Sequence, residues 1–411
     1  MSLLQRLREC VSDDRELEPI LSYASGGGAR MLSRGRVEFY LADPKVTLYA
    51  TVILKRGSIS KITPGPALMS KAAQDLLVEK AANEAANTHG TFVAPRVLLS
   101  ERKLIGHYAW QDRFRIDPCP TSAPIGTGLN WFGQTNFGDF GEAPDGPPYP
   151  FTLLVHVADS PNPFLRLSRS MHDLDTFQYL LTLLVSGHLR TFDSAGERVW
   201  TLARRENGIE NHLLHPGFTT GDETAGASIA APFYQGDDYY NHLWGGDSEI
   251  LLPPSIEQDL EAFHSLDTDE VQKFRRATYW YALGIRNRKE SSLSTVAFST
   301  AIECLLPRIS RPRCAVCKSE LGPGPTHLFK AHLSRYGTVP ESLHEQRSGL
   351  YAARSTLVHG SFAPSIDTGK FSVGDNTFNQ NMLLELVTRR SLLNWLRDPA
   401  RKLGAQCDQK N

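Results

Sequence analysis

The chain has 411 residues, of which 41% are hydrophobic and 22% are charged, and its formal net charge is −1. This length exceeds one ordinary domain, and the composition is typical of a folded globular protein. A net charge so close to zero cannot attract nucleic acid to the molecule as a whole, so any nucleic-acid surface must be a local basic patch.

The first residues (1–19) lack the apolar core of a signal peptide. Their charged composition predicts a short helix. No run of the sequence reaches the roughly 18 apolar residues that a membrane span needs. The six cysteines lie far apart, except for one CxxC pair. This cysteine usage is typical of a reducing compartment, and we expect a cytoplasmic protein without a membrane segment.

A β-rich region is expected over residues 1–250. β-Branched and aromatic residues with partial alternation predict strands, whereas runs rich in Ala, Leu, Glu and Lys predict helices. A Gly/Pro-rich tract at 118–150 predicts loops, and 206–250 reads as irregular. The predicted strands are RVEFYL (36–41), VTLYATVILK (46–55), FTLLVHVA (151–158) and RVWTLARR (198–205), and the predicted helices are 66–88 and 173–192.

Helical periodicity dominates from about residue 254 onward. Apolar residues recur at helical spacing, and Pro307 and Pro399 follow two of the predicted helices. Four helices in about 150 residues imply an antiparallel bundle. We therefore predict an α+β protein, with a β-rich region over 1–250 and an all-α domain over 254–402. The predicted helices are 256–288 (broken once), 292–306, 341–359 and 378–398.

The stretch YAARSTLVHGSF (351–362) places Arg354 and His359 five positions apart on one of these helices. On an ideal helix they are separated by roughly 140°, but a long arginine side chain can still meet a histidine at a phosphate between them. A guanidinium binds phosphate oxygens bidentately, and an imidazole transfers protons near neutral pH. Such a pair is suited to cleave RNA without a metal, because the 2′-OH supplies the nucleophile.

The C-terminal third resembles the HEPN superfamily (higher-eukaryote and prokaryote nucleotide-binding), in particular its ApeA-like abortive-infection branch. RSTLVHG (354–360) is similar to the Rx4–6H motif of the family. The preceding segment KFRRATYWYALGIRNRKESSLSTVAFSTAIECLL (273–306) is similar to the two helices that come before that motif. A CxxC insertion then stands between these helices and the motif, as in this branch.

The resemblance implies a metal-independent endoribonuclease that acts as a homodimer, in which two motifs form one composite site. Arg354 would then hold the scissile phosphate and His359 would transfer protons. Ser355 stands where active members often carry a polar Asn, Asp or His. Glu303 is either a residue that orients the motif from the neighbouring helix or a solvated residue beside an apolar stripe.

The CxxC insertion (311–335) predicts a structural zinc site. Cysteine thiolates and histidines are the usual zinc ligands, and a CxxC turn supplies two of them together. His344 or Cys304 could replace one of the histidines, and the alternative is two ordinary thiols in a loop. The predicted ligands are Cys314, Cys317, His327 and His332, in a C-x2-C-x9-H-x4-H arrangement.

The same insertion is locally basic. Six cations accompany a single acid, Glu320, between residues 308 and 335. This is either a surface that contacts RNA phosphates or ordinary solvated surface. The candidate RNA-binding residues are Arg308, Arg311, Arg313, Lys318, Lys330 and Arg335.

The resemblance implies an antiviral abortive-infection effector that cleaves tRNA or another structured RNA. Its N-terminal region would sense a trigger, for example a phage-derived one, and would restrain the nuclease. The alternative is a non-catalytic HEPN module that binds RNA or protein and carries a ligand-sensing N-terminal domain.

Overall fold

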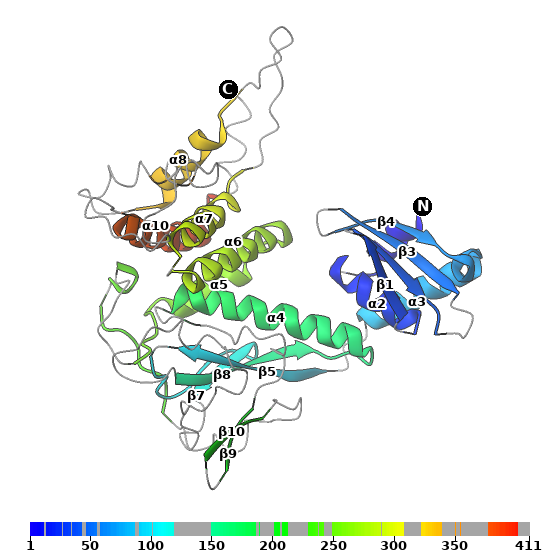
Figure 1. Cartoon of the computed structure of the whole chain (residues 1–411), viewed down its shortest axis with the longest axis horizontal. Helices are drawn as coiled ribbons and strands as arrows, with labels where there is room; N and C mark the ends of the chain where they lie inside the picture. Colours follow the sequence, from blue (N-terminus) through cyan, green and yellow to red (C-terminus); the bar gives the residue numbers. More distant parts are fainter. Residues whose placement is uncertain are drawn as a thin grey trace. The chain divides into compact units, whose positions relative to one another are not determined.

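The computed structural model shows a mixed α+β protein, as predicted (Figure 1). It falls into two compact units. Unit 1 comprises residues 1–94, 111–114 and 154–175, and unit 2 comprises 95–110, 115–153 and 176–411. The structure describes residues 1–11, 14–26, 28–33, 35–42, 47–55, 58–86, 90–100, 102–118, 149–185, 189, 201–205, 208–212, 229–236, 238–241, 249–288, 290–307, 322–338, 350, 354 and 377–401.

Unit 1 is built around an antiparallel four-stranded sheet in the order β1-β2-β3-β4. Cross-strand pairs such as Arg30 with Glu38, and Ile53 with Lys61, fix the register. Each strand follows its neighbour in sequence, so short connections suffice. The elements are α1 (Leu3–Arg8), α2 (Leu17–Ala24), β1 (Gly28–Ser33), β2 (Arg36–Tyr40), β3 (Leu48–Lys55), β4 (Ser58–Pro64) and α3 (Lys71–Ala86).

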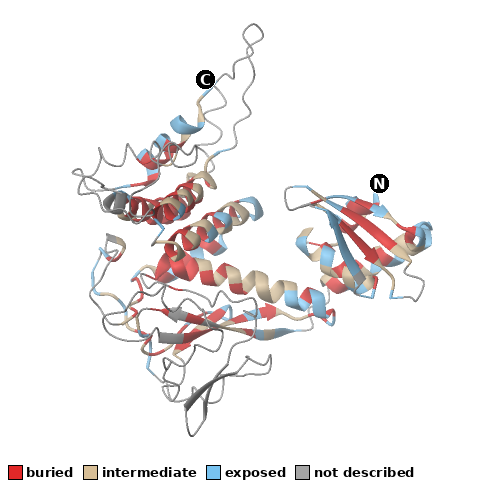
Figure 2. Cartoon of the chain, in the orientation of Figure 1, coloured by how far each residue is buried: buried red, intermediate tan, exposed pale blue. Residues whose placement is uncertain are grey.

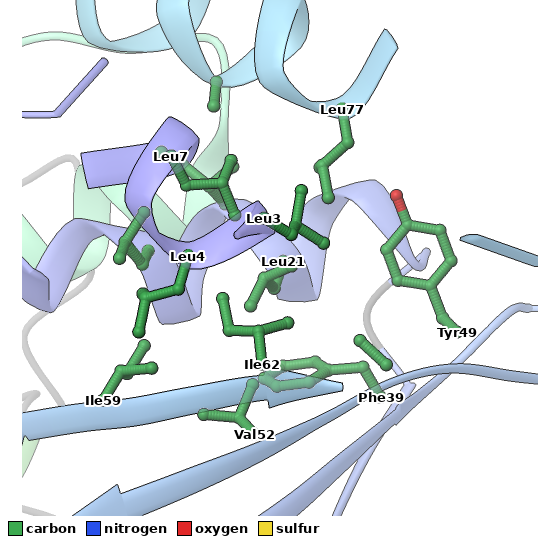
Figure 3. Close-up of a cluster of buried hydrophobic side chains, with 14 of the residues drawn as sticks. Leu3, Leu4, Leu7, Leu21, Phe39, Tyr49, Val52, Ile59, Ile62 and Leu77 are labelled. Atoms are coloured by element: carbon green, nitrogen blue, oxygen red, sulfur yellow. The ribbon is translucent and has the colours of Figure 1, made fainter. Parts of the chain in front are cut away.

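The core of unit 1 lies between this sheet and its helices. Figure 3 shows leucines of α1, α2 and α3 above the sheet, facing apolar side chains that project from the strands. Alternation along the strands places these apolar residues on one face and polar residues on the other. The central contributors are Leu7, Leu21, Leu77, Phe39, Val52 and Ile62.

A second four-stranded sheet has the order β5-β8-β7-β6. The long helix α4 (Pro163–Leu184) follows β8 and begins where the Asn162 side chain accepts hydrogen bonds from the backbone N–H groups of Phe164 and Leu165. A separate antiparallel hairpin follows α4. The strands are β5 (Thr91–Ser100), β6 (Tyr108–Trp110), β7 (Phe114–Pro118) and β8 (Tyr149–Ala158), and the hairpin is β9 (Thr201–Arg205) with β10 (Gly208–His212).

The helical part of unit 2 is centred on α10, which contacts α5, α6, α7 and α8. Figure 2 shows that buried residues line α7. Gly284 lets α6 and α7 approach closely, because an added Cβ would come within 2.5 Å of the Phe298 ring. The helices are α5 (Ile256–His264), α6 (Thr268–Arg286), α7 (Ser291–Glu303), α8 (Pro325–Tyr336) and α10 (Thr377–Arg397).

Most of the predicted elements are confirmed. The strands expected at 36–41, 46–55, 151–158 and 198–205 correspond to β2, β3, β8 and β9. The helix expected at 256–288 breaks into α5 and α6, as predicted, while α4 starts ten residues before the expected position. The irregular reading of 206–250 was wrong in part, because β10 lies there. Of the helix expected at 341–359, only Leu350 and Arg354 are described, and both are helical.

Candidate functional site

The described part of the Rx4–6H motif is Arg354. Its backbone is helical and its side chain is 22% exposed, so the guanidinium is sheltered but still accessible to solvent. The two other motif residues singled out above, Ser355 and His359, lie outside the described residues. The five-residue spacing of arginine and histidine therefore stays a prediction in three dimensions.

Glu303 is the residue that meets Arg354. It is the last residue of α7, and Pro307 follows shortly after the end of that helix. The Arg354 Nη2 donates to the Glu303 Oε2 at 3.2 Å, and the carboxyl side chain is 26% exposed. The two residues are 51 positions apart in sequence, so the contact joins the motif to the end of α7.

Burial and charge act in opposite directions on Glu303. Partial burial raises the pKa of its carboxyl group, because desolvation disfavours the ionised form, whereas the neighbouring Arg354 lowers it. The Nε of Arg354 is buried and has no hydrogen-bond partner among the described residues. Because this nitrogen is closed to solvent, the guanidinium would have to shift before Nε could bind a ligand.

Cys304 lies directly beside this pair as the C-terminal cap of α7. Its thiol is half-buried and free. Desolvation raises the pKa of the thiol to about 11, with Arg276 acting in the lowering direction and Glu303 in the raising direction. The thiol is therefore protonated at neutral pH, which makes it a poor nucleophile at the motif.

The predicted zinc ligands fall partly within the described residues. Cys314 and Cys317 lie outside them, whereas His327 and His332 belong to α8. His327 is exposed and His332 is buried, as their five-residue spacing on one helix requires. In the described ranges no three His, Cys, Asp or Glu residues come together as a metal site.

His332 lies on the buried side of α8. It is 7% exposed, and its Nε2 has no hydrogen-bond partner among the residues described. Its ring lies 4.9 Å from that of Tyr336. Burial, assisted by Arg335, lowers the pKa of His332 to about 4. The imidazole is neutral at pH 7, which is the form that binds a metal.

The predicted RNA-binding cations are only partly tested. Arg308, Arg311, Arg313 and Lys318 lie outside the described residues, and Lys330 is exposed on α8. Arg335 is not free for phosphate, because its Nη2 donates to the Asp398 Oδ2 at 2.6 Å. Arg288, two residues beyond the end of α6, pairs with the buried Glu385, with its Nε 2.7 Å from Oε2.

Arg389 is the centre of a buried cationic network that the sequence does not predict. Arg389 on α10 is 2% exposed and donates to the backbone oxygens of Leu183 and Leu184, each at 2.8 Å. Its guanidinium lies over the rings of Tyr239 and Tyr240. The acceptors are carbonyls at the C-terminal end of α4, where a cation is favoured by the helix dipole. The network joins three segments of unit 2.

A buried carboxylate completes this region. Asp259 of α5 is fully buried and accepts two hydrogen bonds from Arg397, at 2.5 and 2.7 Å. The hydroxyls of Tyr240 and Ser255 donate to the same carboxylate. Every oxygen of Asp259 is thus engaged, so this cluster stabilises the fold and leaves no group for chemistry.

Comparison of the chain with protein-family models, with curated proteins and with solved structures gave no match. Among the described helices, none combines the length and the apolar character that crossing a membrane requires. The site is therefore interpreted from its own residues.

Proposed function

We propose that the protein is a metal-independent endoribonuclease of the HEPN type, with Arg354 and His359 as its catalytic pair. The observation that carries the proposal is the contact between Arg354 and Glu303. An arginine of a surface helix is usually free in solvent, whereas this one is held by a carboxylate of the preceding helix. Such a contact orients the guanidinium before substrate arrives, which lowers the cost of binding a phosphate.

The chemistry requires only groups of the protein and of RNA. The 2′-oxygen attacks the adjacent phosphorus while the bond from phosphorus to the 5′-oxygen breaks. His359 accepts the proton of the 2′-OH or delivers one to the leaving 5′-oxygen. Arg354 would bind the phosphate oxygens, on which negative charge accumulates in the transition state. The products are a 2′,3′-cyclic phosphate and a 5′-OH.

We further propose the biological setting and the assembly. Two motifs would meet in a homodimer and form one composite site, since a single motif supplies one arginine and one histidine. The protein would act as an antiviral abortive-infection effector on tRNA or another structured RNA. Its N-terminal region would restrain the nuclease until a trigger, for example a phage-derived one, arrives.

The substrate side of the proposal is tested with a modified RNA. The protein is expected to cleave an unmodified strand and to leave a 2′,3′-cyclic phosphate. The same strand with a 2′-O-methyl group at each scissile position should stay intact, because its nucleophile is blocked. Cleavage of the methylated strand would require attack by water and would contradict the proposal.

A second candidate function is a HEPN module that binds RNA or a partner protein without cleaving. One observation favours it: Glu303 already neutralises part of the charge that Arg354 could offer to a phosphate. This candidate predicts salt-sensitive RNA binding without cleavage. His359→Ala should leave that binding unchanged.

Glu303 is expected to act as a positioning residue. Glu303→Ala should lower the cleavage rate by about 10- to 100-fold, because the Arg354 side chain loses its anchor and the phosphate site becomes misaligned. Glu303→Gln should retain more activity, since its amide oxygen can still accept from Arg354. The measurement is the single-turnover cleavage rate of both variants. Equal rates in the wild type and in Glu303→Ala would exclude the positioning role.

The pH dependence of stability provides an independent check of Glu303. Its pKa is raised in the folded protein, so the folded state binds this proton more tightly than the unfolded state. The corresponding stability is present below about pH 4.5 and is lost as pH rises through the raised pKa. Relative to the wild type, Glu303→Gln should therefore gain stability as the pH rises above about 4.5. Denaturant unfolding at several pH values measures this, and parallel profiles would contradict it.

We also propose a structural zinc in the CxxC insertion, with Cys314 and Cys317 as ligands. The unused Nε2 of the buried His332 fits a third ligand, whereas the exposed His327 leaves room for His344 or Cys304 as the fourth. The purified protein is expected to contain one zinc per chain. Cys314→Ser should lose it, whereas Cys10→Ser, at a free half-buried thiol in unit 1, should keep it. Elemental analysis measures the zinc content per chain of both variants, and equal zinc contents would contradict the assignment.

A further inference from the structure

The strands of unit 1 carry most of their charge on one face. Arg30, Arg36, Lys55 and Lys61 are the cations of β1 to β4, and Glu38 is the single acid. The pairing of Arg30 with Glu38 puts these two on the same side of the sheet. All four cations are exposed.

The strand register shows that these charges share that side. Arg36 pairs with Ile53, and Ile53 pairs with Lys61, so the three residues form one row across the sheet. Lys55 lies two positions beyond Ile53 and projects in the same direction. Arg36 and Lys61 are two strand spacings apart, about 10 Å. We call Arg30, Arg36, Lys55 and Lys61, with the residues between them, the basic sheet face.

The opposite side of the sheet is covered by α1, α2 and α3. Figure 3 shows the apolar side chains of the strands pointing into this helical layer. The helical layer carries charges of both signs, and Arg6 pairs with Asp75 and Arg8 with Asp14. Unit 1 therefore has a helical side of mixed charge and a basic sheet side.

The only carboxylate on the basic sheet face is already occupied. The Tyr40 hydroxyl donates to Glu38, and Arg36 Nη2 donates to its Oε1 at 2.9 Å. These partners lower the pKa of Glu38, with Tyr40 as the largest cause, and the charge of Arg30 contributes. Lys55 and Lys61 form no ion pair within the described part of the chain. Their charges are available to a ligand.

We propose that the basic sheet face binds the phosphate backbone of single-stranded RNA. Cations about 10 Å apart on an open sheet suit an extended polyanion, and a flat β-surface is a common platform for single strands. Ile53, which is 38% exposed, and the half-buried Tyr40 give the bases apolar contact between the cations. The choice of RNA over an acidic protein segment rests on the proposed nuclease function.

The test compares two double variants of the full-length protein with the same change in charge. Lys55→Gln with Lys61→Gln removes two cations from the basic sheet face. Lys71→Gln with Lys80→Gln removes two from α3, on the opposite layer. Binding is measured by fluorescence anisotropy with a short single-stranded RNA that carries 2′-O-methyl groups, so that cleavage cannot interfere.

Loss of two phosphate contacts should weaken binding about 25-fold at 0.1 M salt and reduce the salt slope by about 1.4, because each contact contributes about 0.7. The Lys71/Lys80 variant should bind as the wild type does. Equal binding by the two double variants would overturn the proposal, as would equally effective competition by poly-glutamate. If the wild-type protein binds RNA through this face but does not cleave it, the proposed nuclease function is refuted and the proposed RNA-binding face is not.

Discussion

Replacing His359 by alanine is expected to lower the RNA cleavage rate by about 10²- to 10⁴-fold, the usual contribution of a positioned general acid or base. The loss follows because His359 would carry the proton in the proposed step. Glu303 is engaged with the guanidinium, and the Cys304 thiol has a pKa raised to about 11. The measurement is a single-turnover rate at neutral pH.

Two controls sharpen this experiment. His156→Ala removes an exposed histidine of β8 and should leave the rate unchanged. Arg354→Lys keeps the charge but loses the bidentate fork, so its rate should fall between those of the wild type and Arg354→Ala. A similar loss in His156→Ala would show that the assay reports folding and not catalysis.

Removal of the buried guanidinium of Arg389 is expected to destabilise the protein by about 2–6 kcal/mol, since each of the two buried carbonyls left without a donor costs about 1–3 kcal/mol. Arg389→Ala would leave the backbone oxygens of Leu183 and Leu184 without their donors and would open a void beside Tyr240. Denaturant unfolding measures the change in the free energy of unfolding.

The neighbouring arginine provides a matched control. Arg390 is more exposed than Arg389, and its Nη1 donates to a single backbone oxygen, that of Thr338, at 2.6 Å. Arg390→Ala should therefore cost about 1 kcal/mol. If both variants lost the same stability, the buried contacts of Arg389 would not hold the end of α4.

Local signals explain which elements could be predicted from the sequence. The break between α5 and α6 coincides with Asp267, whose side chain accepts from the backbone N–H of Glu270 in a capping box. β5 was missed because Pro95 lies in its middle, and a proline normally argues against a strand. The start of α4 was missed because its signal is Asn162 followed by Pro163, ahead of the apolar stripe.

The contacts of the candidate site and its surroundings could be predicted from the sequence only in part. The structure brings Glu303 to Arg354, as the first of its two sequence interpretations expected. Arg335 was expected to contact RNA but is paired with Asp398, because charge counting in sequence cannot see an acid 63 residues away. The buried Arg389 gave no sequence signal, since arginine is normally a surface residue and its acceptors are backbone carbonyls.

The most direct measurement is cleavage of total tRNA by the purified wild-type protein in EDTA, beside His359→Ala, with analysis of the product ends. We predict cleavage by the wild type, 2′,3′-cyclic phosphate on its products, and intact tRNA with the variant. Cleavage that needs added magnesium, or that His359→Ala leaves unchanged, would contradict the assignment of Arg354 and His359 as a metal-free active site.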